Sequence, residues 1–229
     1  MRDPMQNSMR AIGLLGGSFD PVHSAHLAMA DAFASALALD EVRFVPASLP
    51  WQKHGLVATG AQREAMLAAA LAHHRAPRGR YAIDSRELRR EGKTYTIDTL
   101  EQVRGELGAD VSLVFLFGAD QLVHLDTWKD WRRLWDYAHL AAATRHGFDA
   151  QALPDEIAEQ WSARLGDAQA LHSQASGRSY LLDNFAHDVS ATDIRSALAA
   201  GDDPAIEVSS RLVPSTVLDY IRAHNLYRN

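Results

Sequence analysis

The chain lacks cysteine, and it lacks any long apolar segment. None of its 229 residues is Cys, which excludes a disulfide framework, a thiolate nucleophile and a Cys-ligated zinc or iron–sulfur site. No run of residues approaches the roughly 20 apolar positions of a membrane span. We therefore expect a cytoplasmic protein without a membrane partner.

An excess of positive charge is also missing. The chain has 23 Lys and Arg against 29 Asp and Glu, which gives a net charge of −6 with His neutral. Non-specific binding to nucleic acid needs a basic surface that releases counterions from phosphates. We expect no nucleic-acid partner, and an anionic ligand must find a local positive pocket.

Strand and helix patterns alternate along the chain. Apolar runs at 10–16 and 111–117 are typical of buried strands. Within 26–39 the apolar and small residues recur every three or four positions, which is typical of a helix. The other expected strands are 42–45, 80–83 and 140–143, and the other expected helices are 59–71, 97–107, 154–165, 192–200 and 215–224. The alternation predicts the α/β class, with a Rossmann-like doubly wound parallel sheet whose ligands bind beyond the carboxyl ends of the strands.

The length of the chain is within the reach of one α/β domain. We expect a flexible leader at 1–9, which is polar, followed by a single domain at 10–229. Residues 188–229 should form a small C-terminal helical cap of that domain. An oligomer is possible, but the sequence does not indicate its state.

The first candidate site is the string GGSFDPVHSAH at 16–26, where the first strand should turn into the first helix. Its glycines allow a ligand to approach the backbone, and the helix start offers unpaired N–H groups to a phosphate. His23 and His26 could meet one polyphosphate together, as hydrogen-bond donors or as cations. Taken alone, such a pair is more often two surface residues of a first helical turn. No third ligand follows at a zinc-like spacing, so we expect no metal ligand from the protein.

The second candidate is the string VSATDIR at 189–195. Ser190 is a good N-cap with unpaired amides behind it, and Arg195 can donate two N–H bonds to phosphate oxygens. On its own the string is a common helix start.

Together the two strings resemble the nucleotidyltransferases that carry a Gly-Gly-x-Phe-Asp-Pro-x-His-x-Gly-His signature. Within them the chain is similar to the bacterial nicotinate-nucleotide adenylyltransferases, whose second motif is Ile-Ser-Ser/Ala-Thr-x-Ile-Arg. The resemblance runs from Ile12 to Tyr227. One departure is Ala25, which stands where the family has Gly.

Two middle segments carry the same resemblance. Residues 84–100 include Tyr95 and Thr96, which resemble the Tyr-Thr pair whose main-chain amides receive the nicotinate carboxylate in the family. Gly118 and Asp120 match its Gly-x-Asp.

The Trp-rich stretch 128–135 allows two interpretations. Spacings of three and four are typical of a helical core stripe, and we keep that interpretation for Trp131 and Trp135. Trp128 follows Thr127 at an expected helix start and resembles the Thr-Trp of the family, whose indole stacks on the pyridine ring. An exposed indole there would make an aromatic platform.

The loop 46–54 resembles a Pro-Pro-His-Lys/Arg-like loop of the family only in part. Pro50 and Lys53 fit, whereas Trp51 and Gln52 replace the usual Pro and His. A role for Lys53 in binding the acceptor phosphate is compatible with this sequence, and a role for a loop histidine is not.

The resemblance implies transfer of AMP from ATP to nicotinate mononucleotide, which yields deamido-NAD and pyrophosphate in NAD biosynthesis. The phosphate of the mononucleotide attacks the α-phosphorus, so the protein contributes positioning and charge stabilisation rather than a nucleophile. The charge of ATP implies Mg²⁺, bound through phosphates and water.

The residues expected to act follow from this resemblance. The catalytic residues would be His23, His26 and Arg195. The ATP-binding residues would be Gly16, Gly17, Ser18, Phe19, His23, His26, Gly118, Asp120, Ser190, Thr192 and Arg195. Nicotinate mononucleotide would meet Lys53, Tyr95, Thr96 and Trp128.

Two alternatives stay open. The chain could be another nucleotidyltransferase of the superfamily, with nicotinamide mononucleotide or phosphopantetheine as acceptor. It could also be a nucleotide-binding sensor without turnover, which ATP would stabilise without release of pyrophosphate.

Overall fold

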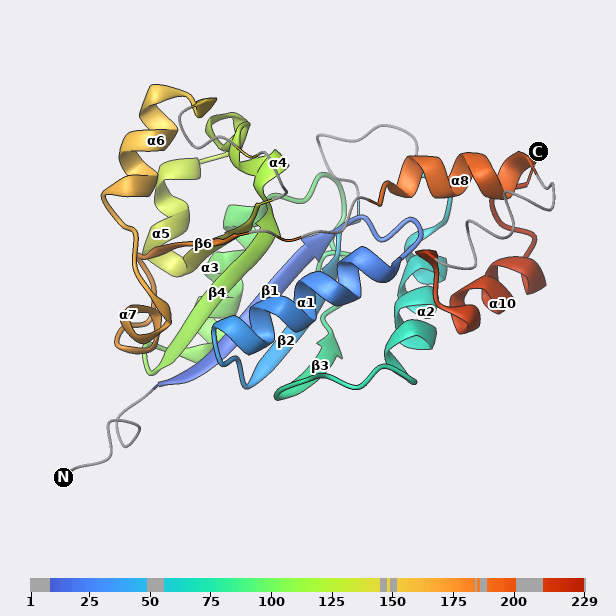
Figure 1. Ribbon diagram of the computed structural model, residues 1–229, viewed down its shortest axis with the longest axis horizontal. Coiled ribbons are helices and arrows are strands. Elements are labelled where there is room, and N and C mark those ends of the chain that lie inside the picture. Colours follow the sequence, from blue (N-terminus) through green and yellow to red (C-terminus); the bar gives the residue numbers. More distant parts are fainter. Residues whose placement is uncertain are drawn as a thin grey trace.

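The computed structural model describes residues 9–48, 56–144, 148, 152–183, 185, 189–200 and 212–228 (Figure 1). These residues build a six-stranded sheet in the order β3-β2-β1-β4-β5-β6, and every neighbouring pair is parallel. The strands are β1 (Arg10–Gly17), β2 (Glu41–Pro46), β3 (Arg80–Ile83), β4 (Val111–Gly118), β5 (His139–Ala143) and β6 (Ser179–Leu182). This is the strand order of a doubly wound Rossmann-like sheet, and the predicted fold class is confirmed.

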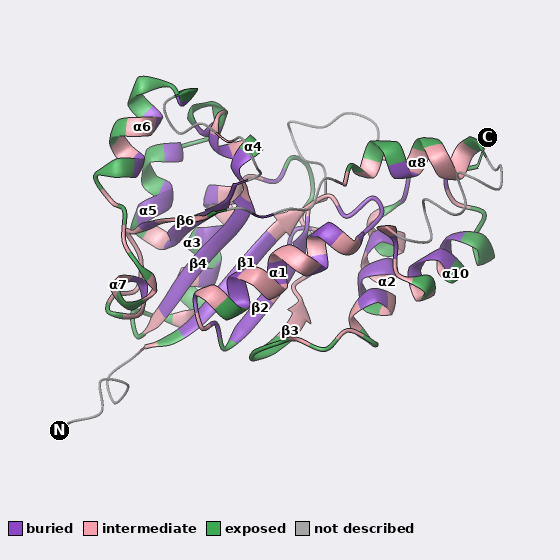
Figure 2. Cartoon of the chain, viewed as in Figure 1, coloured by how far each residue is buried: buried purple, intermediate pink, exposed green. Residues whose placement is uncertain are grey.

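Helices cover both faces of the sheet (Figures 1 and 2). The helices are α1 (Ser24–Ala36), α2 (Gly60–Leu71), α3 (Thr96–Leu107), α4 (Ala119–Leu122), α5 (Leu134–Tyr137), α6 (Asp155–Ser162), α7 (Ala168–His172), α8 (Ala191–Ala200) and α10 (Ser215–Ala223), with 3₁₀ turns η1 (Leu125–Thr127) and η2 (Trp131–Arg133). Alternate residues of β4 face opposite cores: Leu116 packs with α1 and α2, and Phe117 packs with α5 and α6. A strand buried on both faces is apolar at nearly every position, and in β4 only the buried Ser112 departs from this, which is why 111–117 carries so strong a strand signal.

The capping pattern predicted at the start of α2 is present. The Thr59 amide donates to Gln62 Oε1 at 2.8 Å, and the Gln62 amide donates to Thr59 Oγ1 at 3.3 Å. These reciprocal bonds satisfy two amides that the helix leaves unpaired. α2 therefore begins at a fixed residue and presents its apolar face to β2 and β3.

The Trp-rich stretch is not one helix. Trp131 and Trp135 are buried, with ring centroids 6.2 Å apart, as the core interpretation predicted. Trp128 does not begin a helix, because it lies between η1 and η2. Asp130 takes a left-handed φ of 51°, and this interrupts any regular helix there.

The two ends of the described chain are held by contacts. The Met9 amide donates to the carbonyl of His172 at 3.2 Å, while the rest of the expected leader lies outside the described residues. On the other side, Thr216 of α10 donates to the Ala69 carbonyl of α2 at 2.8 Å. None of the described helices is long and apolar enough to cross a membrane.

Candidate active site

A cleft of about 760 Å³ opens at the carboxyl ends of β1 and β4. β1 and β4 are neighbours in the sheet. After β1 the next strand, β2, is added on one side of this pair, and after β4 the next strand, β5, is added on the other side. Such a switch point leaves a crevice for ligands in doubly wound sheets. The cleft is lined by most of the predicted site residues, namely Gly16, Gly17, Ser18, His23, His26, Thr96, Gly118, Asp120, Trp128, Ser190, Thr192 and Arg195.

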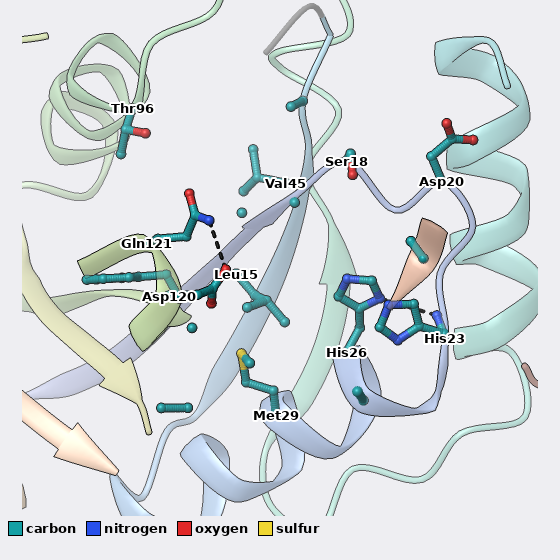
Figure 3. A pocket seen from close by; sticks show the side chains of 18 of the residues that line it. Leu15, Ser18, Asp20, His23, His26, Met29, Val45, Thr96, Asp120 and Gln121 are labelled. Carbon is teal, nitrogen blue, oxygen red and sulfur yellow. Dashed lines mark hydrogen bonds between the residues drawn. The ribbon is translucent and has the colours of Figure 1, made fainter. Parts of the chain in front are cut away.

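The two histidines stand at the start of α1 with their rings together (Figure 3). His23 is the N-cap and His26 the third helical residue, and their ring centroids are 3.7 Å apart. The His23 amide donates to His26 Nδ1 at 3.2 Å. Because Nδ1 accepts, the proton of a neutral His26 ring belongs on Nε2. The backbone thus orients His26 as a hydrogen-bond donor at the cleft.

Phe19 packs against His26 and does not line the cleft. It is fully buried, and its ring meets the ring of His26 edge-on at 4.9 Å. A Cβ at Gly17 would lie 2.9 Å from the Phe19 ring, so the glycine is needed for this packing. The prediction that Phe19 lines the nucleotide cleft was wrong, because its place in the string next to cleft residues does not show which way its side chain points. Ala25, the departure from the signature, lines the cleft and is buried.

The second motif closes the same cleft. Ser190 Oγ accepts from the Thr192 amide at 3.2 Å, which is the predicted capping role. Arg195 donates through Nη2 to Thr192 Oγ1 at 3.1 Å and through Nη1 to the Asp20 carbonyl at 2.8 Å. The guanidinium therefore ties α8 to the signature string.

The far wall of the cleft comes from the residues after β4 (Figure 3). Asp120 Oδ2 accepts from Gln121 Nε2 at 2.9 Å. A Cβ at Gly118 would collide with the Asp120 carboxylate. A side chain at position 118 would therefore make the Asp120 carboxylate turn away from the strand end.

The start of α3 forms the opposite half of the cleft. Tyr95 is the N-cap without a side-chain cap bond, so the first amides of α3 have no side chain to satisfy them there. Thr96 lines the cleft, but Tyr95 does not, since its ring lies under the Lys129 ammonium at 4.9 Å. The contact expected of Tyr95 is that of its main-chain amide with the nicotinate carboxylate, which the position of the ring does not test, so it stays a prediction.

Glu87 is a buried cleft residue that sequence reasoning did not single out as a site residue. It accepts from Thr99 Oγ1 at 2.7 Å, and Thr99 in turn accepts from Arg90 Nη1 at 2.7 Å. Burial raises the pKa of the Glu87 carboxyl. Its position four residues after Ile83, at the carboxyl end of β3, is the signal that could have marked it.

Trp128 lines the cleft and is held from behind by aromatic rings. Its ring centroid lies 6.0 Å from that of Phe115 and 6.1 Å from that of Phe117. Its Nε1 is buried and has no hydrogen-bond partner among the described residues. The rings of Phe115 and Phe117 support the half-buried indole from one side, as an aromatic platform requires.

Two buried charged side chains, Asp20 and Arg63, were also missed. Asp20 is 1% exposed and Arg63 is 1% exposed, and Arg63 Nη1 donates to the Ser18 carbonyl at 2.7 Å. Burial lowers the pKa of Arg63, and the nearby Asp20 carboxylate counteracts this. Arg63 lies one turn before Met66 and Leu67 on the buried face of α2, and a charge on that face was the available signal.

Comparison with known proteins identifies the family. The cytidylyltransferase-like family model matches residues 14–197. A protein of Herminiimonas arsenicoxydans named "Probable nicotinate-nucleotide adenylyltransferase" is 47% identical over 98% of this chain and 100% of its own length. A protein of the same name from Chromobacterium violaceum is 47% identical over 95% of this chain and 98% of its own. The chain belongs to the nicotinate-nucleotide adenylyltransferases.

Solved structures share the fold of this adenylyltransferase family member. The nicotinic acid mononucleotide adenylyltransferase of Plasmodium falciparum complexed with NaAD has a TM-score of 0.74 at 19% identity, over 95% of this chain and 97% of that chain. The same enzyme complexed with APC has a TM-score of 0.72 at 18% identity, over the same shares of the two chains. At this identity the likeness shows the fold.

Two expectations about this adenylyltransferase remain predictions. Lys53 lies outside the described residues. Within the described ranges no group of three or more His, Asp or Glu side chains could hold a metal ion. That Mg²⁺ binds through the phosphates of the nucleotide stays a prediction.

Proposed function

We propose that this chain transfers the AMP group of ATP to nicotinate mononucleotide, as a cytoplasmic step of NAD biosynthesis. The observation that carries the proposal is the convergence of two distant motifs. The histidines at the start of α1 and Arg195 of α8 line one cleft, and the start of α3 faces them across it. The cleft therefore offers hydrogen-bond donors to a triphosphate and to an acidic acceptor.

The ATP half is formed by the signature string, α8 and the end of β4. Gly16, Gly17 and Ser18 leave the backbone open to the nucleotide, and Ser190, Thr192 and Arg195 hold the β and γ phosphates. Gly118 and Asp120 form the far wall. His23 and His26 contact the phosphates and stabilise the charge that develops at the α-phosphorus.

The acceptor half is formed by α3 and Trp128. The N-terminal amides of a helix favour an anion, so those near Thr96 receive the nicotinate carboxylate while the indole of Trp128 stacks on the pyridine ring. Lys53 binds the acceptor phosphate. A carboxamide would gain less from these amides than a carboxylate, because it carries no charge.

The reaction needs no nucleophile from the protein. An oxygen of the mononucleotide phosphate attacks the α-phosphorus, the bond to the β-phosphate breaks, and pyrophosphate leaves. Mg²⁺ held by the phosphates of ATP and water would neutralise part of the charge. The protein aligns the two phosphates and supplies donors to the transition state, which is where such sites gain rate.

Product analysis tests this proposal. Purified protein is incubated with ATP, Mg²⁺ and nicotinate mononucleotide, and the products are identified by mass spectrometry beside a pyrophosphate assay. We expect deamido-NAD and pyrophosphate in equal amounts. Thermal stabilisation by ATP with no pyrophosphate would instead support the nucleotide sensor and contradict the proposal.

A further inference from the structure

Asp20 fastens three segments of the chain beside the cleft. Its Oδ1 accepts from the Tyr227 hydroxyl at 2.6 Å and from the Ala58 amide at 3.2 Å, and its Oδ2 accepts from the Val57 amide at 2.8 Å. Its carbonyl accepts from Arg195 Nη1 at 2.8 Å. The residue thus joins the signature string to the segment before α2, to α8 and to the chain after α10.

Tyr227 supplies the side-chain donor of this junction from a constrained position. The residue is 6% exposed, and its φ of 61° lies in the left-handed region that non-glycine residues rarely adopt. Such a conformation persists when surrounding contacts determine it, and it is typical of functional sites. The ring does not line the cleft, so Tyr227 does not touch the substrates of the proposed reaction.

The main chain of the signature string is held at two neighbouring points. Arg63 of α2 donates a hydrogen bond to the Ser18 carbonyl at 2.7 Å. The Tyr227 hydroxyl donates to the Asp20 carboxylate, and the Asp20 carbonyl accepts from Arg195. The donors of the ATP half therefore depend on both anchors for their relative placement.

We propose that Tyr227 is a positioning residue for adenylyl transfer, acting through Asp20 to align the signature string with Arg195. This inference rests on the proposed function. A misplacement of catalytic groups by about 1 Å can cost up to a hundredfold in rate. Loss of the Tyr227 hydroxyl should consequently change turnover, although the hydroxyl is outside the cleft.

The test compares two Tyr→Phe variants of the full chain. Tyr227→Phe keeps the ring and removes the hydroxyl. We expect kcat to fall about tenfold, with the KM for nicotinate mononucleotide within twofold of that of the wild type. Tyr220→Phe is the matched control, because Tyr220 belongs to α10 and its ring packs on His224 instead. Its kcat should not change.

A double-mutant cycle separates positioning from a general structural effect. Asp20→Ala removes the carboxylate that accepts from the Tyr227 hydroxyl and from the amides of Val57 and Ala58. If Tyr227 acts through Asp20, adding Tyr227→Phe to Asp20→Ala should lower kcat much less than it does in the wild type. One hydrogen bond is a small part of the stability of a domain, and circular dichroism at the assay temperature verifies that each variant is folded.

Several outcomes would overturn the inference. These are an unchanged kcat in Tyr227→Phe, a lower melting temperature with unchanged kinetics, or fully additive effects in the cycle. Calorimetry with Mg–ATP and no acceptor keeps the test independent of the proposed function. We expect Tyr227→Phe to raise the dissociation constant at least threefold, even if the wild type binds ATP without turnover, and an unchanged constant would overturn the inference as well.

Discussion

His26 is the side chain whose orientation is best explained by the backbone around it. The His23 amide occupies Nδ1, and Phe19 meets the ring edge-on. His26→Ala should lower kcat by about a hundredfold or more, because it removes one donor from the developing charge at the α-phosphorus. Steady-state pyrophosphate release measures this effect.

His73→Ala is the matched control for that substitution, because His73 is exposed and outside the cleft. The melting temperatures of both variants should stay close to that of the wild type. A His26→Ala variant with near-normal kcat would contradict the role given to His26.

At the residue scale, the sequence predicted which residues lie at the site better than it predicted where their side chains point. The glycines, His23, His26 and Arg195 line the cleft as expected. Phe19 does not, because a left-handed φ of 49° turns its ring into the core. The sequence motif alone does not indicate this backbone conformation.

At the element scale, Arg104 of α3 fixes the helix against the far end of the sheet. Its guanidinium donates to four carbonyls, those of Gly108, Val111, Tyr137 and Ala175, at 2.6–2.9 Å. Arg104→Ala should lower the free energy of unfolding by about 3 kcal/mol, because it removes several charge-assisted bonds. Urea unfolding measures this change.

The exposed Arg78 provides the comparison for that measurement. Arg78→Ala should unfold at the urea concentration of the wild type within about 0.5 kcal/mol. Equal midpoints for the Arg104 and Arg78 variants would show that the four bonds contribute nothing net.

Long periodic elements were predictable, and short ones were predictable only in part. α1, α2 and α3 carry apolar residues at helical spacing over three turns. Among the elements of four residues, the bounds of β3 match the prediction, whereas β6 and α4 were not predicted because so short a segment shows no clear period. The Trp-rich stretch misled because spacings of three and four also suit 3₁₀ turns that bury two indoles.

At the scale of the whole molecule, His139 makes stability depend on pH. It is fully buried in β5, its Nε2 bonds to the Gln174 carbonyl at 3.0 Å, and its Nδ1 accepts from the Arg178 amide at 2.9 Å. Burial lowers its pKa to about 4. The unfolded chain takes up a proton near pH 6.5 and the folded chain does not, so stability should fall by about 3 kcal/mol between pH 6.5 and 4.

His139→Gln isolates this contribution. The variant should be less stable than the wild type at pH 7, and the difference should shrink by about 3 kcal/mol as the pH falls to 4. Chemical unfolding at several pH values measures it, with His73→Gln as the exposed counterpart. A constant difference at every pH would show that His139 does not titrate as described.

The sequence predicted the class of topology and the region of the sheet where the site lies. Alternating elements indicate a doubly wound sheet, and ligands then belong at its switch point. The junction of Asp20 with Arg195 and Tyr227 was out of reach, because it joins residues 175 and 207 positions apart through single bonds. No local pattern records such contacts.

The central claim is that one cleft binds ATP and recognises a carboxylate on the acceptor. The most direct measurement is kcat/KM with Mg–ATP for nicotinate mononucleotide, nicotinamide mononucleotide and phosphopantetheine under identical conditions. We predict a strong preference for nicotinate mononucleotide, because it alone offers both a pyridine ring for Trp128 and a carboxylate for the amides of α3. Equal or greater efficiency with either of the other acceptors, or no turnover with any of them, would contradict the account.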